Sequence, residues 1–132
     1  MTGLEKCTKG WVTIFGYDLS IKQDLDEVRK ITGYCPEQDR LYEQLNCYEH
    51  LEIFARIKEI PSREIEMKIK SMLQKVELSD FEKTIALNLN ACQKRKLCLA
   101  IALIGDPEVI QKFSFNLLNF NLIDKIIIFL RF

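Results

Sequence analysis

Few residues of this chain have the character and spacing of a reactive site. The single histidine, His50, falls in the first turn of a predicted helix, and no cysteine, serine or carboxylate is spaced to act with it. We therefore interpret His50 as structural. The five cysteines, at positions 7, 35, 47, 92 and 98, are odd in number and contain no CxxC pair. This pattern indicates reduced, partly buried thiols and predicts neither a disulfide framework nor a metal site.

Three pairs of polar residues have the spacing of a capping box, in which two residues at a helix start satisfy each other's backbone N–H groups. The pairs are Asn46 with Glu49, Ser79 with Glu82, and Asn90 with Gln93. Asparagine and serine side chains accept well from backbone N–H groups at this position. Each pair therefore predicts the start of a helix.

The elements that would position these residues can be read from the apolar periodicity. Short strands are predicted over 12–15 and 31–35, with one or two helical turns between them over 24–30. Helical periods follow from Asn46, from Pro61-Ser62 to Val76, and from about Gln93 to Ile104, before Gly105-Asp106-Pro107. Strands followed by several helices fit a fragment of an α/β domain that carries a helical insertion.

The composition suits a folded chain and excludes one class of partner. The chain has 132 residues, 48% of them hydrophobic, and its 19 basic residues balance its 19 acidic residues. A nucleic-acid-binding domain normally has a basic excess, so we expect no nucleic-acid partner. The one dense basic run, Lys94-Arg95-Lys96, lies in a helical pattern and is interpreted as a solvated helix face.

The last part of the chain differs from the rest in composition. Its uncharged runs, 113–123 and 126–130, are shorter than the roughly 20 apolar residues that a helix needs to span a bilayer. The run 126–130 is apolar and β-prone, so it could pair as a strand or aggregate. We expect the isolated chain to be marginally stable.

Four stretches, in order, resemble the nucleotide-binding domain of A-subfamily ABC transporters. They are Gly16-Tyr17-Asp18 after a strand, residues 32–39 (TGYCPEQD), residues 49–61 (EHLEIFARIKEIP), and residues 89–97 (LNACQKRKL) with 100–107 (AIALIGDP). They are similar to the family's GYD, IGYCPQ-x-D, EHL..FA.IKGIP and LSGGQKRKL…AIALIGDP. The series covers roughly positions 10 to 109, which is far more than any one short motif could support.

The resemblance implies an α/β fold: a fragment of a P-loop NTPase-type ABC nucleotide-binding domain with its mostly helical subdomain. It places a partial domain at 1–110, the helical subdomain at about 40–92, and a divergent apolar tail at 111–132. Its implied cofactors are ATP and Mg²⁺. Its implied partners are a transporter transmembrane domain and a second nucleotide-binding domain, at the cytoplasmic face of a membrane. The parent protein would couple ATP hydrolysis to lipid transport.

Two motifs that such an ATPase needs are not found in this sequence. A phosphate-binding loop has the pattern G-x-x-x-x-G-K-[ST], but the glycines lie at 3, 10, 16, 33 and 105. By the resemblance, that loop would lie before Met1. An apolar strand ending in Asp-Glu should follow the GDP segment, but residues 111–114 are QKFS. We therefore expect the chain to be inactive alone and assign it no catalytic residue.

Two nucleotide-facing segments have altered residues. Glu37 stands where the family has the glutamine that contacts metal and water, and Gln38 could replace that glutamine only by a shift of one residue. The alternative is that residues 37–39 form a plain polar loop after Pro36. The signature LSGGQ corresponds to Leu89-Asn90-Ala91-Cys92-Gln93. Asn90 and Gln93 can still cap the helix, whereas Ala91 and Cys92 add Cβ atoms where glycines would let the backbone approach a phosphate.

Three hypotheses remain open. The chain is a truncated or degenerate nucleotide-binding domain, or a non-catalytic module that binds transporter transmembrane segments around Tyr42 to Tyr48. The third possibility is a domain that lends its signature segment to an intact phosphate loop in a partner nucleotide-binding domain. Ala91 and Cys92 count against this third hypothesis because they hinder approach to a phosphate.

Overall fold

The computed structural model describes residues 13–14, 16–18, 20–36, 38–107 and 109–112. The polar N-terminal end, residue 37 and the apolar tail from 113 onward lie outside the described residues. The elements run in the order β1 (Thr13–Ile14), β2 (Tyr17–Asp18), α1 (Lys22–Ile31), β3 (Thr32–Cys35), α2 (Cys47–Ile57), α3 (Ser62–Lys75), η1 (Ser79–Phe81), η2 (Ala86–Asn88), α4 (Ala91–Leu103) and β4 (Val109–Lys112).

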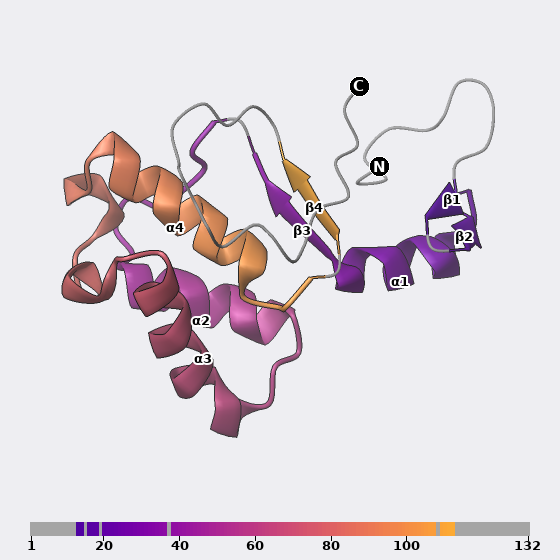
Figure 1. The fold of residues 1–132 in the computed structure, drawn as a ribbon, viewed down its shortest axis with the longest axis horizontal. Helices are drawn as coiled ribbons and strands as arrows, with labels where there is room; N and C mark the ends of the chain where they lie inside the picture. The colour runs from indigo at the N-terminus through magenta and orange to yellow at the C-terminus, as the bar shows by residue number, and fades with distance from the viewer. Residues whose placement is uncertain (1–12, 15, 19, 37, 108, 113–132) are drawn as a thin grey trace.

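The described strands form two small sheets near opposite ends of α1 (Figure 1). Strands β1 and β2 pair antiparallel around Gly16, whose φ of 85° suits a glycine in a tight turn. Strands β3 and β4 pair in parallel, with Thr32 opposite Val109 and Cys35 opposite Lys112. The parallel pair joins segments that are far apart in the sequence, and the helices α2, α3 and α4 supply the connection between them.

Helix α4 packs closely against β3 at Gly33. A Cβ atom on Gly33 would lie 2.2 Å from the carbonyl oxygen of Ala102 and 2.9 Å from Cγ of Pro107. Both distances are too short for a side chain, so only glycine allows α4 to approach the strand this closely. This contact places α4 beside the loop that follows β3.

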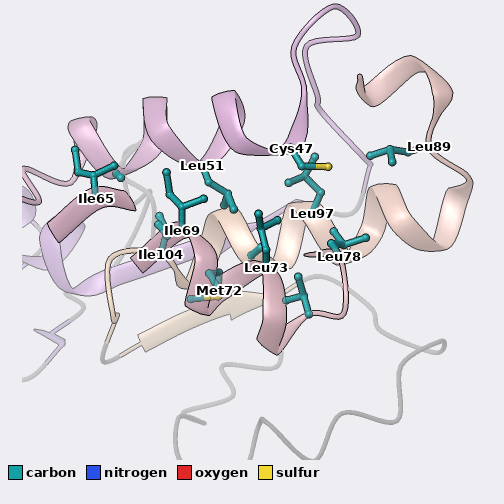
Figure 2. Close-up of a cluster of buried hydrophobic side chains, with 13 residues drawn as sticks. Cys47, Leu51, Ile65, Ile69, Met72, Leu73, Leu78, Leu89, Leu97 and Ile104 are labelled. Carbon is teal, nitrogen blue, oxygen red and sulfur yellow. The ribbon is translucent and has the colours of Figure 1, made fainter. Parts of the chain in front are cut away.

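The core lies among α2, α3 and α4, as Figure 2 shows. Its fully buried large side chains include Leu51 from α2, Ile69 and Leu73 from α3, and Leu97 from α4. Each fully buried side chain of this size stabilises the fold by roughly 1.5–3 kcal/mol. Hydrophobic burial is therefore concentrated in the helical part of the chain.

Sequence signals predicted most helix boundaries. Helix α2 begins at a capping box in which Asn46 Oδ1 accepts from the Glu49 N–H at 2.8 Å and Glu49 Oε2 accepts from the Asn46 N–H at 2.8 Å. Helix α3 begins after Pro61, as predicted. The predicted capping box at Ser79 and Glu82 is wrong. Ser79 instead opens the short 3-10 helix η1, which has no side-chain cap, because the chain turns after Leu78 enters the core.

Helices α2 and α3 both end in a left-handed residue that is not glycine. Glu59 has φ 58° and Glu77 has φ 56°. In each case the following residue reaches back: the Ile60 N–H donates to Ala55 O at 3.1 Å, and the Leu78 N–H donates to Leu73 O at 2.8 Å. A hydrogen bond from the residue after the left-handed position back to the last part of the helix is typical of a Schellman motif. This motif usually has glycine at the left-handed position. The chain keeps the motif with glutamate in both places.

Candidate nucleotide-facing site

The start of α4 is a complete capping box, as the sequence predicts. Asn90 Oδ1 accepts from the Gln93 N–H at 2.8 Å, and Gln93 Oε1 accepts from the Asn90 N–H at 2.9 Å. Asn90 precedes the helix in an extended conformation, with φ −73° and ψ 168°. Both polar side chains are therefore engaged in starting the helix, and one N–H that a ligand could have used is satisfied internally.

Residues 89–93, which correspond to the signature motif, combine a buried side chain with two exposed ones. Leu89 is 5% exposed and belongs to the helical core, so it fixes the segment. Ala91 and Cys92 are exposed in the first turn of α4. Backbone N–H groups at a helix start attract anions, but the Cβ atoms of these two residues stand where an unsubstituted backbone would allow the closest approach.

The loop after β3 is held against α4 by Arg95. Nη1 of Arg95 donates to the carbonyl oxygen of Pro36 and lies 3.2 Å from Oδ1 of Asp39. Gln38, between these two partners, is exposed, and Glu37 lies outside the described residues. Arg95 thus joins two segments whose residues are 56 to 59 positions apart, the loop after β3 and the signature helix.

Beneath this loop, two thiols lie between β3 and α4. Cys35 is fully buried and Cys98 is 3% exposed, and they pack in one small apolar cluster with Ala102. Burial raises the pKa of the Cys98 thiol to about 12, and the negative charge of Asp39 adds to this effect. Cys98 therefore stays protonated and unreactive at neutral pH.

The interpretation of Lys94-Arg95-Lys96 as a solvated helix face is wrong for two of its residues. The side chain of Arg95 is 14% exposed, and that of Lys96 is 16% exposed with its Nζ 2.7 Å from Oε2 of Glu77. The reason is that residues 97–100, one turn later, are all buried, so α4 is enclosed on most sides. The apolar residues that follow Lys96 in the sequence could have indicated that this part of the helix is enclosed.

His50 has a structural role, as predicted. It is 1% exposed, its Nε2 accepts from the Tyr42 N–H at 3.0 Å, and its Nδ1 lies 2.8 Å from the carbonyl oxygen of Asn46. This arrangement fits a neutral ring that carries its proton on Nδ1. Both ring nitrogens are therefore used in holding the segment that precedes α2.

Residues for a magnesium–ATP site are not assembled in the described part of the chain. Among residues 13–14, 16–18, 20–36, 38–107 and 109–112, no group of three histidine, cysteine, aspartate or glutamate side chains could hold a metal ion. The start of α4 offers a helix terminus, but its capping side chains are engaged with each other. The described residues do not fit a complete nucleotide site of their own.

The sequence and the fold identify the class of protein. The profile of the family described as "ABC transporter" matches residues 1–111. An ATP-binding subunit of an ABC transporter superposes with a TM-score of 0.70 at 25% identity, over 83% of this chain and 45% of that chain. A dimeric ATP-binding cassette in a post-hydrolysis state, with bound ADP and Pi, superposes with a TM-score of 0.71 at 23% identity over 83% of this chain and 50% of that one. The chain belongs to the ABC transporter family and has part of the P-loop NTPase fold of its nucleotide-binding domain.

Its curated relatives belong to subfamily A. It is 38% identical over 110 residues to human ATP-binding cassette sub-family A member 6 and 37% identical over 110 residues to human member 10. It is 37% identical over 109 residues to the mouse ABC-type organic anion transporter ABCA8A. Each match covers 83% of this chain and 7% of the relative, so the chain corresponds to a small part of those proteins. In the part of this chain that the structure describes, no helix has the length and apolar character of a membrane span.

Proposed function

We propose that the chain is a truncated or degenerate nucleotide-binding domain that does not hydrolyse ATP by itself. The observation that carries this proposal is the start of α4, where Asn90 and Gln93 complete a helix cap while exposed Ala91 and Cys92 replace the expected glycines. The helix is thus preserved and its approach to a phosphate is hindered. The parent protein would act at the cytoplasmic face of a membrane and couple ATP hydrolysis to lipid transport. One relative, ABCA8A, is named as an organic anion transporter, so organic anions are a second cargo class for the parent protein.

Calorimetric titration of the purified chain with ATP and Mg²⁺ tests the proposal. We expect no saturable heat and no phosphate release above the buffer background. Saturable binding accompanied by hydrolysis, and reduced in a Lys94→Ala variant made and purified in the same way, would overturn it. The variant serves as a check because a contaminating ATPase would contribute equally to both preparations.

The hypothesis that the chain lends its signature to a partner has its own test. The chain is mixed with an ABC domain that has an intact phosphate loop, and its Ala91→Gly/Cys92→Gly double variant is compared with Ala91→Ser/Cys92→Ser. The serine variant keeps both Cβ atoms and is the matched control. Hydrolysis that rises only with the glycine variant would support a shared site. Equal hydrolysis in both mixtures would exclude that role for α4.

The second candidate function is a non-catalytic module that binds transporter transmembrane segments. Tyr42 is 63% exposed and Leu87 is 49% exposed, and their segments lie side by side. The Leu87 N–H donates to Glu43 O at 3.1 Å, and the Ala86 N–H donates to Leu45 O at 2.9 Å. His50 Nε2 accepts from the Tyr42 N–H and so fixes the first of these two segments. Exposed apolar side chains on a fixed backbone are suited to contact a partner.

Binding to solubilised transmembrane domains of a subfamily A transporter tests this candidate. Tyr42→Ser and Leu87→Ser should each weaken coprecipitation severalfold. Met67→Ser is the control, because Met67 is 68% exposed but lies on α3. Unchanged binding in Tyr42→Ser and Leu87→Ser, or an equal loss of binding in Met67→Ser, would contradict a specific binding surface at Tyr42 and Leu87.

A further inference from the structure

Lys58 makes hydrogen bonds to residues that are far away in the sequence. It directly follows α2, and its Nζ donates to Arg29 O at 3.0 Å, Lys30 O at 3.4 Å and Thr32 O at 2.8 Å. These carbonyl groups lie at the end of α1 and the start of β3, 26 to 29 residues away in the sequence. The ammonium therefore joins the helical core to the α1–β3 segment.

The position of this cation matches the electrostatics of a helix end. The last carbonyl groups of a helix have no partner inside it, and the helix dipole makes this end negative. The hydroxyl of Thr32 donates to Val28 O at 2.7 Å, and Lys58 supplies donors to the next two carbonyl groups. Side chains thus satisfy three consecutive carbonyl groups at the end of α1.

The stem of Lys58 is also confined. A Cβ atom on Gly105 would lie 3.0 Å from Cγ and 3.1 Å from Cδ of Lys58, so the backbone just beyond the end of α4 packs directly on the stem. Burial lowers the pKa of the Lys58 ammonium. The side chain is thus fixed between α1 and the end of α4.

Few other contacts among the described residues tie α1 to the helical core. Asp24 Oδ2 accepts from the Asp18 N–H at 2.9 Å, but this bond joins α1 to β2. Val28 is its only fully buried side chain, whereas α2 and α3 bury four residues each. Lys30 forms an exposed pair with Glu27 on the same helix, and such a pair does not attach the helix to another element. A helix with so few buried contacts depends strongly on any tie at its end.

We propose that Lys58 is a conformational latch: its ammonium fixes the end of α1 to the helical core, and loss of that charge releases α1 while α2, α3 and α4 remain folded. Helix α1 thus has a separate, lower stability than the helical core, and Lys58 controls it independently of nucleotide binding.

Hydrogen exchange of the full chain, measured by mass spectrometry, tests the latch. In Lys58→Met, which keeps an apolar stem beside Gly105, peptides covering 22–31 should exchange about tenfold faster, since bonds to a charged donor typically contribute at least that factor. Peptides from α2, α3 and α4 should be unchanged. Lys58→Arg keeps a cationic donor and should retain part of the protection of α1.

Lys83→Met is the matched control, because Lys83 is an exposed lysine in the turn before η2. It should leave exchange in 22–31 unchanged. Unchanged exchange of α1 in Lys58→Met would overturn the latch. So would equal acceleration in all four helices, since that result means global destabilisation, or an equal effect of Lys83→Met.

Discussion

The Arg95 guanidinium lies 3.2 Å from the Asp39 carboxylate and joins the signature helix to the loop that follows β3. The two side chains are 14% and 29% exposed, so solvent screens the pair less than an ordinary surface pair. Arg95 also donates to Pro36 O, which fixes the start of the same loop. The loop after β3 and the start of α4 are therefore held as one unit.

A double-mutant cycle between Arg95→Met and Asp39→Asn measures this coupling. We expect a coupling energy of about 1 kcal/mol, at the upper end for ion pairs, because the pair is largely enclosed. Urea denaturation followed by circular dichroism gives the four stabilities. The control cycle uses Lys70 and Glu66, which are 2.6 Å apart but 60% and 66% exposed. Its coupling should be about 0.3–0.5 kcal/mol. Equal couplings in the two cycles would contradict a special role for Arg95.

Local sequence signals predicted the helices well because helix starts are local events. Asn46 with Glu49 and Asn90 with Gln93 need only a spacing of three residues, and both capping boxes form. The same spacing at Ser79 failed, because the neighbouring Leu78 is drawn into the core and leaves room for only one short turn. A local motif predicts a helix only where the following residues have an apolar face to bury.

The contacts of Arg95 and Lys58 could not be predicted from local patterns. Their partners lie 26 to 59 residues away and are mostly backbone carbonyl groups, which every residue has and which leave no mark in the sequence. The basic run around Arg95 therefore suggested solvent exposure. Arg95 is enclosed because the loop after β3 lies against it, with Pro36 O and Asp39 Oδ1 as acceptors of its guanidinium.

The cap of α4 should contribute measurably to stability. Asn90→Ala removes the acceptor for the Gln93 N–H and should lower the free energy of unfolding by about 1 kcal/mol. Asn90→Ser supplies an equivalent acceptor and should change it by only a few tenths. Urea denaturation of the two variants measures the difference. If both substitutions cost the same, the side-chain cap is not the source of the effect.

Glycine at position 59 should stabilise the chain. Glu59 adopts a φ of 58°, and a residue with a Cβ atom pays roughly 1 kcal/mol for that conformation. Glu59→Gly should therefore raise the free energy of unfolding by up to about 1 kcal/mol. Glu77→Gly relieves a similar φ of 56° but loses the ion pair with Lys96, so its gain should be smaller. Thermal denaturation of both variants tests this order, and a larger gain at 77 would refute it.

Alkaline conditions should destabilise the fold through its buried thiols. Burial raises the pKa of Cys98 to about 12 and that of Cys47 to about 11, from a usual value of 9.0. Above pH 9 the unfolded chain releases these protons while the folded chain keeps them, so stability falls as pH rises toward 11. Below pH 9 the contribution is fully present. Urea midpoints across this range should fall less steeply in Cys98→Ala. The exposed Cys92→Ala variant is the control and should keep the steep fall; equal slopes in all three proteins would contradict the prediction.

The contact between α4 and β3 can be tested at Gly33. A Cβ atom there would lie 2.2 Å from a backbone oxygen, which cannot move aside as a flexible side chain could. Gly33→Ala should therefore force α4 away from β3 and destabilise the chain by about 1–3 kcal/mol, the usual cost of overpacking. Thermal denaturation measures the loss, and labelling of Cys35 and Cys98 by a thiol reagent should accelerate because both thiols lie in this contact.

Gly16→Ala is the comparison, because among the described residues no atom beyond its chain neighbours lies within 4 Å of its Cβ position, and its φ of 85° is what opposes a side chain. That substitution should cost roughly 1 kcal/mol through backbone strain alone and leave the labelling of both thiols unchanged. The two glycines thus separate steric exclusion between elements from local conformational strain. Slow labelling in Gly33→Ala would mean that α4 stays in place against β3, and the close approach at Gly33 would not be what positions the signature helix.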